Sequence, residues 1–402
     1  MNKNLQTLFE IANKPARAII GLMSGTSMDG LDVALCEVSG NGEATKVMLR
    51  KFATVDYSDD IKNEIRQVFA KKTIDFQHLT LLNAWIGNLH AQMVLDCLHN
   101  WHIEPPEIDL IASHGQTVMH APKSLHGLEK FPNATLQIGD GDHVAVKTGI
   151  ITISDFRQKH IAAGGEGAPL AVYGDYFIFG HRGENRIMLN MGGIANFTYL
   201  PESMNPEDVL VTDTGPGNTL IDAFTKRAFP EIHFDRNAEI ASKGASSLVL
   251  LNALKENVFF KRPFPKTTGP ELFSVEYVKS AQEQSGTEAI SIDDLLATLT
   301  QFSAETIAEG IQRAISESAH ANADFKIYMS GGGTHNPLLV AMLKKLLPYT
   351  FHKTDALGID GNAKEAVLFA ILANETVVGG ASNFGTRKGI PSVSMGKISF
   401  PA

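Results

Sequence analysis

A glycine-rich turn between two strand-like apolar runs constrains this sequence more than any other feature. The turn lies within residues 21–32, which read GLMSGTSMDGLD, and apolar runs at 18–20 and 33–38 flank it. The pattern predicts a β-hairpin whose tip offers hydroxyls, backbone N–H groups and the carboxylates of Asp29 and Asp32. Such a tip can surround phosphate oxygens, and either carboxylate can hold Mg²⁺ beside them. Taken alone, the stretch is equally consistent with an ordinary glycine-rich hairpin.

Two later glycine clusters also follow apolar strands. Residues 213–218 (DTGPGN) follow a strand-like run and precede helical spacing, which suits a second phosphate turn. Residues 331–333 are three consecutive glycines after another strand-like run, and Asn336-Pro337 then opens a helix. Three glycines let a flat adenine or ribose lie against the backbone. Each cluster alone could be a tight strand-to-helix connection, but three such turns together predict a nucleotide site.

Strand-like and helical patterns alternate along the 402 residues, which predicts an α/β protein. We expect strands at 18–23, 31–38, 46–55, 108–113, 151–154, 187–191, 209–212 and 326–330. We expect long helices at 59–71, 76–100, 293–320, 337–347 and 362–377. Apolar residues in the third of these helices recur at helical spacing and are interpreted as core: Leu295, Leu299, Phe302, Ile307, Ile311 and Ile315.

Bulk properties favour a cytoplasmic enzyme that binds neither nucleic acid nor membrane. The net charge of −9 argues against binding anionic polymers or lipids by bulk electrostatics. The first residues lack a signal-peptide core, and no apolar run reaches transmembrane length. Cys36 and Cys97 lie in apolar contexts and are expected to be buried thiols. His114, His120 and His335 lack metal-ligand spacing, so we interpret them as polar loop residues and predict no transition-metal site.

Eight segments occur in an order that identifies a family resemblance. They are residues 21–32, 113–118 (SHGQTV), 136–141 (LQIGDG), 155–157 (DFR), 164–170 (GGEGAPL), 190–196 (NMGGIAN), 213–218 and 330–337 (SGGGTHNP). Together they resemble the anhydro-N-acetylmuramic acid kinases, part of the actin, heat-shock chaperone and hexokinase superfamily. The resemblance runs from about residue 18 to the C-terminus.

The resemblance implies a two-domain actin-like ATPase (ribonuclease H-like) α/β fold with a nucleotide cleft between the domains. We place the N-terminal domain at 1–158, with the tail 386–402 returning to it, and the C-terminal domain at 159–385. A homodimer that uses ATP and Mg²⁺ is also implied.

The implied reaction joins hydrolysis to phosphorylation. Water would open the 1,6-anhydro ring of the amino sugar, and the freed 6-oxygen would take the γ-phosphoryl group, giving N-acetylmuramate 6-phosphate and ADP in peptidoglycan recycling. Asp155 matches the family's catalytic base and would deprotonate that water. Position alone favours a structural role for Asp155, a salt bridge with Arg157 or a cap for the following helix, and the resemblance reverses this preference.

The remaining candidate residues divide between ATP and sugar. Phosphate contacts are expected from Gly25, Thr26, Ser27, Met28, Asp29, Gly30, Leu31, Asp32, Asp213, Gly215 and Gly217, and adenosine contacts from Gly331, Gly332 and Gly333. Mg²⁺ would arrive with ATP, and Asp29 or Asp213 is its candidate ligand. Sugar contacts are expected from Gln116, Thr117, Arg157 and, through the resemblance, Glu365.

The sequence departs from the family pattern near the expected sugar site. His160 stands where the family usually carries Asp, and Glu166 stands where it usually carries Gln. Both changes bear on sugar specificity more than on the class of reaction.

Other functions share the same nucleotide turns. A plain sugar or acetate kinase, or a phosphatase, would use them with an Asp base, and the opening of an anhydro bond is what separates these readings. A chaperone-like ATPase would need a peptide-binding segment, of which the sequence gives no sign. The absence of G-x-x-x-x-G-K-[ST] and of G-x-S-x-G excludes a Walker-type enzyme and a serine hydrolase of that type.

Overall fold

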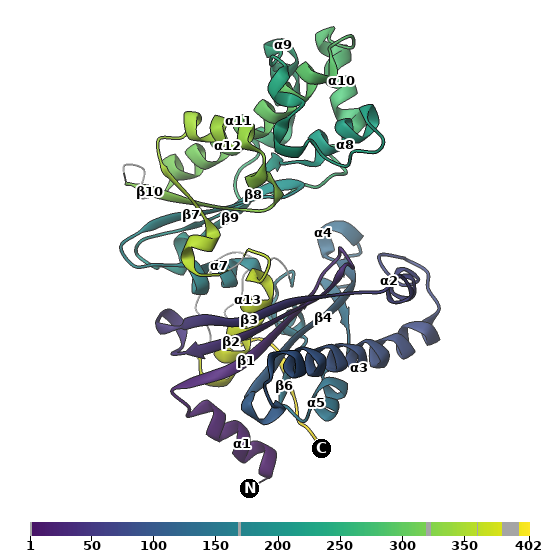
Figure 1. Ribbon diagram of the computed structural model, residues 1–402, viewed down its shortest axis with the longest axis vertical. Helices are drawn as coiled ribbons and strands as arrows, with labels where there is room; N and C mark the ends of the chain where they lie inside the picture. The colour runs from purple at the N-terminus through teal and green to yellow at the C-terminus, as the bar shows by residue number, and fades with distance from the viewer. Residues whose placement is uncertain (1, 168–169, 319–322, 360, 380–393) are drawn as a thin grey trace. The chain divides into compact units, whose positions relative to one another are not determined.

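The computed structural model describes residues 2–167, 170–318, 323–359, 361–379 and 394–402 (Figure 1). Its contacts divide the chain into two compact units, a first unit of residues 1–179 and 358–402 and a second unit of residues 180–357. These limits differ from the expected boundaries at 158 and 385. The reason is that α13 (Lys364–Val378) packs on both α7 (Ala171–Phe179) and β1 (Ala16–Ser24), so these late and middle segments join the first unit.

The first unit is built on a mixed sheet in the order β12-β6-β4-β1-β2-β3, with β5 paired to β4. Its other strands are β2 (Gly30–Ser39), β3 (Lys46–Asp56), β4 (Leu110–Ala121), β5 (Ala134–Ile138), β6 (Thr152–Ser154) and β12 (Lys397–Ser399). Strands β1, β2 and β3 pair antiparallel, whereas β1–β4 and β4–β6 pair parallel. The C-terminal strand β12 runs antiparallel to β6, so the end of the expected tail returns to this sheet, whereas residues 386–393 of that tail lie outside the described residues.

The second unit repeats this topology. Its sheet has the order β11-β10-β7-β8-β9 and consists of β7 (Asn185–Met191), β8 (Ile194–Leu200), β9 (Leu210–Pro216), β10 (Phe325–Ser330) and β11 (Thr350–Lys353). Strands β7, β8 and β9 pair antiparallel, whereas β7–β10 and β10–β11 pair parallel. The order and directions match those of β6-β4-β1-β2-β3. This repeat confirms the expected actin-like (ribonuclease H-like) α/β fold.

Helices supply the remaining layers of both units. In the first unit they are α1 (Lys3–Ala12), α2 (Asp59–Arg66), α3 (Phe76–Trp101), α4 (Lys123–His126), α5 (Gly141–Thr148), α6 (Phe156–Ala162), α7 and α13. In the second unit they are α8 (Thr219–Ala228), α9 (Leu248–Lys255), α10 (Val275–Ser285), α11 (Ile292–Glu317) and α12 (Pro337–Leu346). The strands and long helices expected from the sequence are present, but the helix expected at 59–71 ends at Arg66, and residues 319–320 of the helix expected at 293–320 lie outside the described residues. Strands β5, β8, β11 and β12 were missed.

The apolar stripe on α11 is core, as predicted. Its first three members, Leu295, Leu299 and Phe302, are buried in a cluster with α8, α9 and α10. Its last three members, 307, 311 and 315, are buried against β7, β8 and β10. Each such side chain contributes roughly 1.5–3 kcal/mol through burial, so this helix joins the two cores of the second unit.

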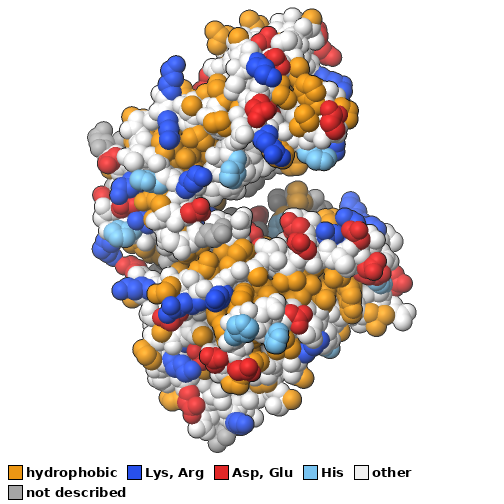
Figure 2. Space-filling view, viewed as in Figure 1, with side chains coloured by type: hydrophobic (Ala, Val, Ile, Leu, Met, Phe, Trp, Pro, Cys, Tyr) orange, Lys and Arg blue, Asp and Glu red, His pale blue; other side chains and the backbone are white. Residues whose placement is uncertain are grey.

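Other bulk features follow the sequence analysis. Cys36 and Cys97 are buried free thiols, as expected. Of the helices that the structure describes, none has the length and apolar character required to cross a bilayer. Acidic and basic side chains are interspersed over the face drawn in Figure 2, so an anionic ligand must be held by local donors.

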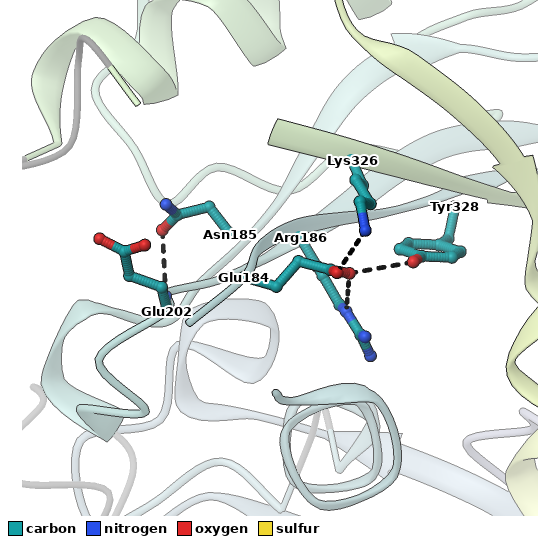
Figure 3. A network of polar contacts seen from close by, with 6 residues as sticks. All are labelled: Glu184, Asn185, Arg186, Glu202, Lys326 and Tyr328. Carbon is teal, nitrogen blue, oxygen red and sulfur yellow. Dashed lines mark hydrogen bonds and ion pairs between the residues drawn. The ribbon is translucent and has the colours of Figure 1, made fainter. Parts of the chain in front are cut away.

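A polar network fixes the start of β7 beside β10 (Figure 3). Glu184 accepts hydrogen bonds from Arg186 Nε at 2.6 Å, Lys326 Nζ at 2.5 Å and Tyr328 OH at 3.0 Å. These donors outweigh the effect of burial, which by itself would raise the pKa of this carboxyl, and lower that pKa to about 2. The network therefore stabilises the sheet only while Glu184 is ionised.

Candidate active site

The first candidate phosphate turn is the tip of the β1–β2 hairpin, as the sequence predicts. The antiparallel pairing ends at Met23 and Asp32, which leaves residues 25–29 beyond it. Thr26, Ser27 and Asp29 are exposed. Among the described residues, no acceptor faces the backbone N–H groups of Thr26 and Ser27. The tip thus presents the donors and the carboxylate that a magnesium-bound phosphate needs.

Gln116 braces this hairpin from its base. Its Nε2 donates to the carbonyl oxygens of Gly25 at 2.8 Å and Thr117 at 2.9 Å, and its Oε1 accepts from Ser24 Oγ at 2.7 Å. The side chain is fully buried. We predicted a sugar contact for Gln116, but in this structure its amide is occupied in holding the hairpin. Thr117 is also nearly buried, and its Oγ1 accepts from Gln137 Nε2 at 3.4 Å.

The space around each hairpin glycine shows whether the fold itself requires glycine at that position. A Cβ on Gly30 would lie 2.4 Å from Val55 O, so the fold itself requires that glycine. A Cβ on Gly25 would meet only Met23 Cε, at 3.3 Å, and Gly25 has no left-handed backbone. Close approach of a ligand to the backbone is therefore the remaining reason for glycine at position 25.

Asp155 directly follows β6 in a strained conformation. Its φ of 56° and ψ of 46° lie in the left-handed region, which costs a non-glycine residue about 1 kcal/mol or more. It occupies the N-cap position of α6, yet its side chain makes no cap hydrogen bond. It forms an ion pair with Lys397, not with Arg157. Asp155 therefore neither caps α6 nor pairs with Arg157, the two structural roles that its position allows.

Arg157 reaches from α6 back to strand β4. Its Nε donates to His114 Nε2 at 2.9 Å, and its Nη1 donates to Gly167 O at 2.7 Å. Loss of solvation lowers the pKa of Arg157, and the charge of Glu365 opposes this effect. His114 and His120 lie on β4, so our assignment of these two histidines to loops was wrong.

Glu365 and Asp32 belong to the same charged group as Arg157. Glu365 is an exposed residue, but its carboxyl lies in a crowded surrounding, and loss of solvation raises its pKa; Lys364 and Arg157 lower this pKa, and Asp32 raises it. Loss of solvation also raises the pKa of Asp32, against a 2.6 Å hydrogen bond from Thr54 Oγ1. The base of the hairpin, the start of α6 and the first turn of α13 therefore bring these predicted site residues together.

The second unit brings three glycine turns together. Gly217 N donates to Gly193 O at 2.8 Å, and Asn218 donates to Gly192 O from its backbone N at 2.9 Å and from Nδ2 at 3.1 Å. A Cβ on Gly331 would lie 2.8 Å from the carbonyl of the last residue of β7. The turns after β7, β9 and β10 therefore form one surface of backbone.

The turn between β7 and β8 was missing from the predicted site residues. Residues 190–196 were recognised only as part of the family resemblance, and Gly192-Gly193 received no role. The signal that could have found it is the one used elsewhere, a pair of glycines between two strand-like runs.

A pocket of about 510 Å³ opens beside the Gly331–Gly333 turn. Its lining consists of Asn237, Thr334, His335, Pro337, Val340, Ala341 and Lys344. The lining combines apolar side chains with a few polar groups, and the depression is broadly open to solvent. A Cβ on Gly332 would meet only Asn218 Nδ2, at 3.7 Å, so the fold leaves room above that glycine as well.

Asp213 is the ionisable member of the second phosphate turn. Its Oδ2 accepts from Thr268 N at 2.8 Å, and within the described part of the chain no donor reaches its Oδ1. Loss of solvation raises the pKa of Asp213 to about 6, and the nearby Glu271 adds to this effect. Its neighbours Gly215, with φ 146°, and Gly217 are glycines because a Cβ would crowd Phe260 and Gly192 O, respectively.

The residues present fit a magnesium ion that arrives with ATP. Mg²⁺ keeps several waters and is usually held by one or two carboxylates together with substrate phosphates. Over the described residues, no group of three or more His, Cys, Asp and Glu side chains forms a metal site of its own. Asp29 at the hairpin tip and Asp213 Oδ1 can each supply the single carboxylate.

Comparisons with known proteins show the family of this chain. A sequence model of the anhydro-N-acetylmuramic acid kinase family matches residues 17–400. The anhydro-N-acetylmuramic acid kinase of Pseudoalteromonas atlantica is 55% identical and that of Pseudoalteromonas translucida 52% identical, each over the full length of both chains. Among solved structures, hexokinase from Schistosoma mansoni in complex with glucose has a TM-score of 0.35 and 12% identity, over 90% of this chain and 86% of that chain. The sequence matches decide the family, and the chain belongs to the anhydro-N-acetylmuramic acid kinases, which are phosphotransferases.

Proposed function

We propose that this chain uses ATP and water to convert 1,6-anhydro-N-acetylmuramic acid into N-acetylmuramate 6-phosphate and ADP. The substrate follows from the name that its relatives carry. The single observation that supports the chemistry is Asp155, an acid held in a strained backbone conformation that neither caps its helix nor pairs with Arg157. Strained backbone conformations cluster at active sites, so the strain at Asp155 supports a catalytic role for this acid.

Asp155 would act as general base. It takes a proton from a water molecule whose oxygen bonds to the anomeric carbon, and the bond from that carbon to the 6-oxygen breaks. The 6-oxygen bonds to the γ-phosphorus, and ADP leaves. An alkoxide is a poor leaving group that normally needs a general acid, and here the electrophilic phosphorus replaces that acid. A single displacement at the anomeric carbon predicts inversion there.

Phosphoryl transfer would depend on positioning and charge stabilisation. The N–H groups of Thr26 and Ser27 are proposed to hold the terminal phosphates, with Asp29 or Asp213 on Mg²⁺. When bound, Mg²⁺ would neutralise charge on the phosphate oxygens. The adenosine is proposed to lie on Gly331–Gly333 and in the adjoining pocket.

Arg157, Thr117 and Glu365 are the proposed sugar contacts. Arg157 is supported by its fixed guanidinium and by its place two residues after the proposed base. Glu365 is supported by its electrostatic coupling to Arg157. Gln116 is proposed to act indirectly, since it holds the hairpin. The family relationship further supports a cytoplasmic homodimer with a role in peptidoglycan recycling.

The test is to incubate the protein with ATP, Mg²⁺ and 1,6-anhydro-N-acetylmuramic acid in ¹⁸O-labelled water and to identify the products by mass spectrometry. We expect a ring-opened 6-phosphate that carries the label at the anomeric oxygen. A phosphorylated sugar with its anhydro bond intact, or ADP and inorganic phosphate without a sugar product, would overturn the proposed reaction. Either result would favour a plain kinase or an ATPase.

A further inference from the structure

We propose that His114 is a positioning residue, which orients Arg157 for the sugar by accepting a hydrogen bond from its Nε. This inference rests on the proposed function, in which Arg157 contacts the sugar. It gives a role to a histidine in the 113–118 segment that neither the motif nor the mechanism above explains.

The contacts of His114 determine which ring nitrogen carries the hydrogen. Its Nδ1 lies 2.8 Å from Gly115 O and 3.2 Å from Ser24 O, and its Nε2 lies 2.9 Å from Arg157 Nε. Carbonyl oxygens can only accept, so Nδ1 must donate. The guanidinium Nε can only donate, so Nε2 must be free of hydrogen. The neutral imidazole with hydrogen on Nδ1 is the form that satisfies all these partners.

The surroundings keep this ring neutral and still. His114 is 2% exposed, and burial together with the charge of Arg157 lowers its pKa to about 3. Its ring lies 4.8 Å from the ring of Phe369, which in turn lies 5.3 Å from the ring of Phe156. A charged imidazole would lose its acceptor and face a cation, so the neutral form persists at physiological pH.

This arrangement fixes the guanidinium and links it to the hairpin. The nitrogens of Arg157 lie in one rigid plane, and two of them are already bound, Nε to His114 and Nη1 to Gly167 O. Because the guanidinium is planar, holding two of its nitrogens also sets the direction of the third, Nη2, to which no acceptor is bound among the described residues. Through Ser24 O, at the end of β1, the same imidazole also contacts the base of the phosphate hairpin.

Two substitutions separate the roles of the two ring nitrogens of His114. In His114→Asn the amide nitrogen can replace Nδ1 toward the carbonyls, but nothing remains to accept from Arg157. In His114→Gln the longer side chain can place Oε1 near the position of Nε2 and restore that acceptor. We expect His114→Asn to raise the KM for the anhydro sugar about tenfold and to change the KM for ATP less than about twofold. His114→Gln should keep the sugar KM within about threefold of wild type.

Two kinetic outcomes would contradict the positioning role of His114. Equal sugar KM values for the two variants, or an equal rise in the KM for ATP, would overturn the positioning role, provided that both variants show the circular dichroism spectrum of the wild type. A wild-type protein that does not phosphorylate the anhydro sugar at all would instead overturn the proposed function.

A second measurement needs no substrate. In ¹⁵N NMR of the histidine-labelled protein, His114 should show a protonated Nδ1 and an unprotonated Nε2 at pH 7, without titration above pH 5. The resonance is assigned by its loss in His114→Gln. A hydrogen on Nε2, or titration near pH 6.5, would overturn the inference whatever the kinetics show.

Discussion

Lys397, on the C-terminal strand, donates from its Nζ to Oδ2 of Asp155, the acid that follows β6. The pairing of β12 with β6 places Lys397 opposite Ser154, one residue before this acid. Gly396 has a φ of 97°, and a Cβ there would lie 2.5 Å from a side-chain carbon of Ile153. The tail is fitted closely against β6 and brings a cation to one carboxylate oxygen of Asp155, and no partner of the other oxygen lies among the described residues.

Asp155→Asn should abolish turnover and leave ATP binding nearly unchanged. The amide cannot take a proton from water, but the substitution removes no proposed phosphate contact. We expect the rate of sugar 6-phosphate formation to fall by about 10³-fold or more, measured by mass spectrometry. Calorimetric titration with ATP should give a Kd within about twofold of wild type. Appreciable residual sugar phosphorylation would show that another group is the base.

Lys397→Met should lower kcat modestly. The ion pair is largely exposed, with 67% of the Lys397 side chain and 27% of the Asp155 side chain accessible, so its worth is about 0–1 kcal/mol. That range corresponds to a loss of up to about fivefold in kcat, with Lys397→Arg as the control that keeps the cation. Because salt screens exposed charges, the wild-type kcat should approach that of Lys397→Met near 1 M salt. Identical rates at low salt would mean that the pair does not orient the base.

Glu184 should make the second unit sensitive to acid. Its pKa is lowered to about 2 in the folded protein and is 4.5 without these interactions. Because the pKa of Glu184 is lower in the folded state, its ionised form stabilises the fold at pH values above the pKa of the unfolded state. This stabilisation is lost as the pH falls from about 5 toward 2. We expect Glu184→Gln to lower the free energy of unfolding by about 1–2 kcal/mol at pH 7, since the group is partly screened by solvent.

The role of Glu184 is checked by the difference in free energy of unfolding between wild type and Glu184→Gln, because other carboxyls titrate in the same pH range and affect both proteins. Urea denaturation of wild type and Glu184→Gln at pH 7, 5 and 3.5 should show a gap that narrows with acid. Glu231→Gln is a suitable control, because Glu231 is an exposed carboxyl of the same unit outside this network. A gap that stays constant from pH 7 to 3.5 would contradict the assignment.

Local pattern predicted much of the fold. The β1–β2 hairpin, the strands before the glycine turns and the buried stripe of α11 each carry their signal within about a dozen residues. The repeated topology of the two sheets carries no such signal, because it lies in the order of pairing between distant strands. The association of α13 with β1 depends on a glycine, Gly21, whose Cβ would lie 1.8 Å from Ala366 O some 345 residues along the chain.

Site residues could be predicted where their role follows from residue type and position in the sequence. They could not be predicted where the role depends on a contact between distant segments. Asp155, Arg157 and the glycine turns could be found from residue type and position. The bracing role of Gln116 and the buried state of His114 could not, since both follow from parallel pairing of β4 with β1. The Lys397 contact joins residues 242 apart in sequence and has no sequence pattern.

Gly25→Val should weaken ATP binding without harming the fold. A side chain at this position meets only a flexible methionine, yet it would occupy the space where a phosphate would approach the backbone. We expect the Kd for ATP to rise about tenfold or more, and the Tm to change by less than about 2 °C.

Gly30→Val is the matched comparison for Gly25→Val. A Cβ at position 30 would lie 2.4 Å from Val55 O, so this variant should lose stability. An unchanged ATP affinity in a folded Gly25→Val protein would show that the hairpin tip is not the phosphate site.

Asp213 should make ATP binding weaken in mild acid. Loss of solvation raises its pKa to about 6, so the carboxylate is mostly ionised at pH 7 and mostly neutral at pH 5. If Asp213 holds the Mg²⁺ that accompanies ATP, the Kd for MgATP should rise by about tenfold over that interval. Asp213→Asn should bind weakly at pH 7 and show a flat profile, whereas Asp29→Asn should keep the wild-type slope. A slope that survives in Asp213→Asn would show that Asp213 is not the carboxylate that holds the ion.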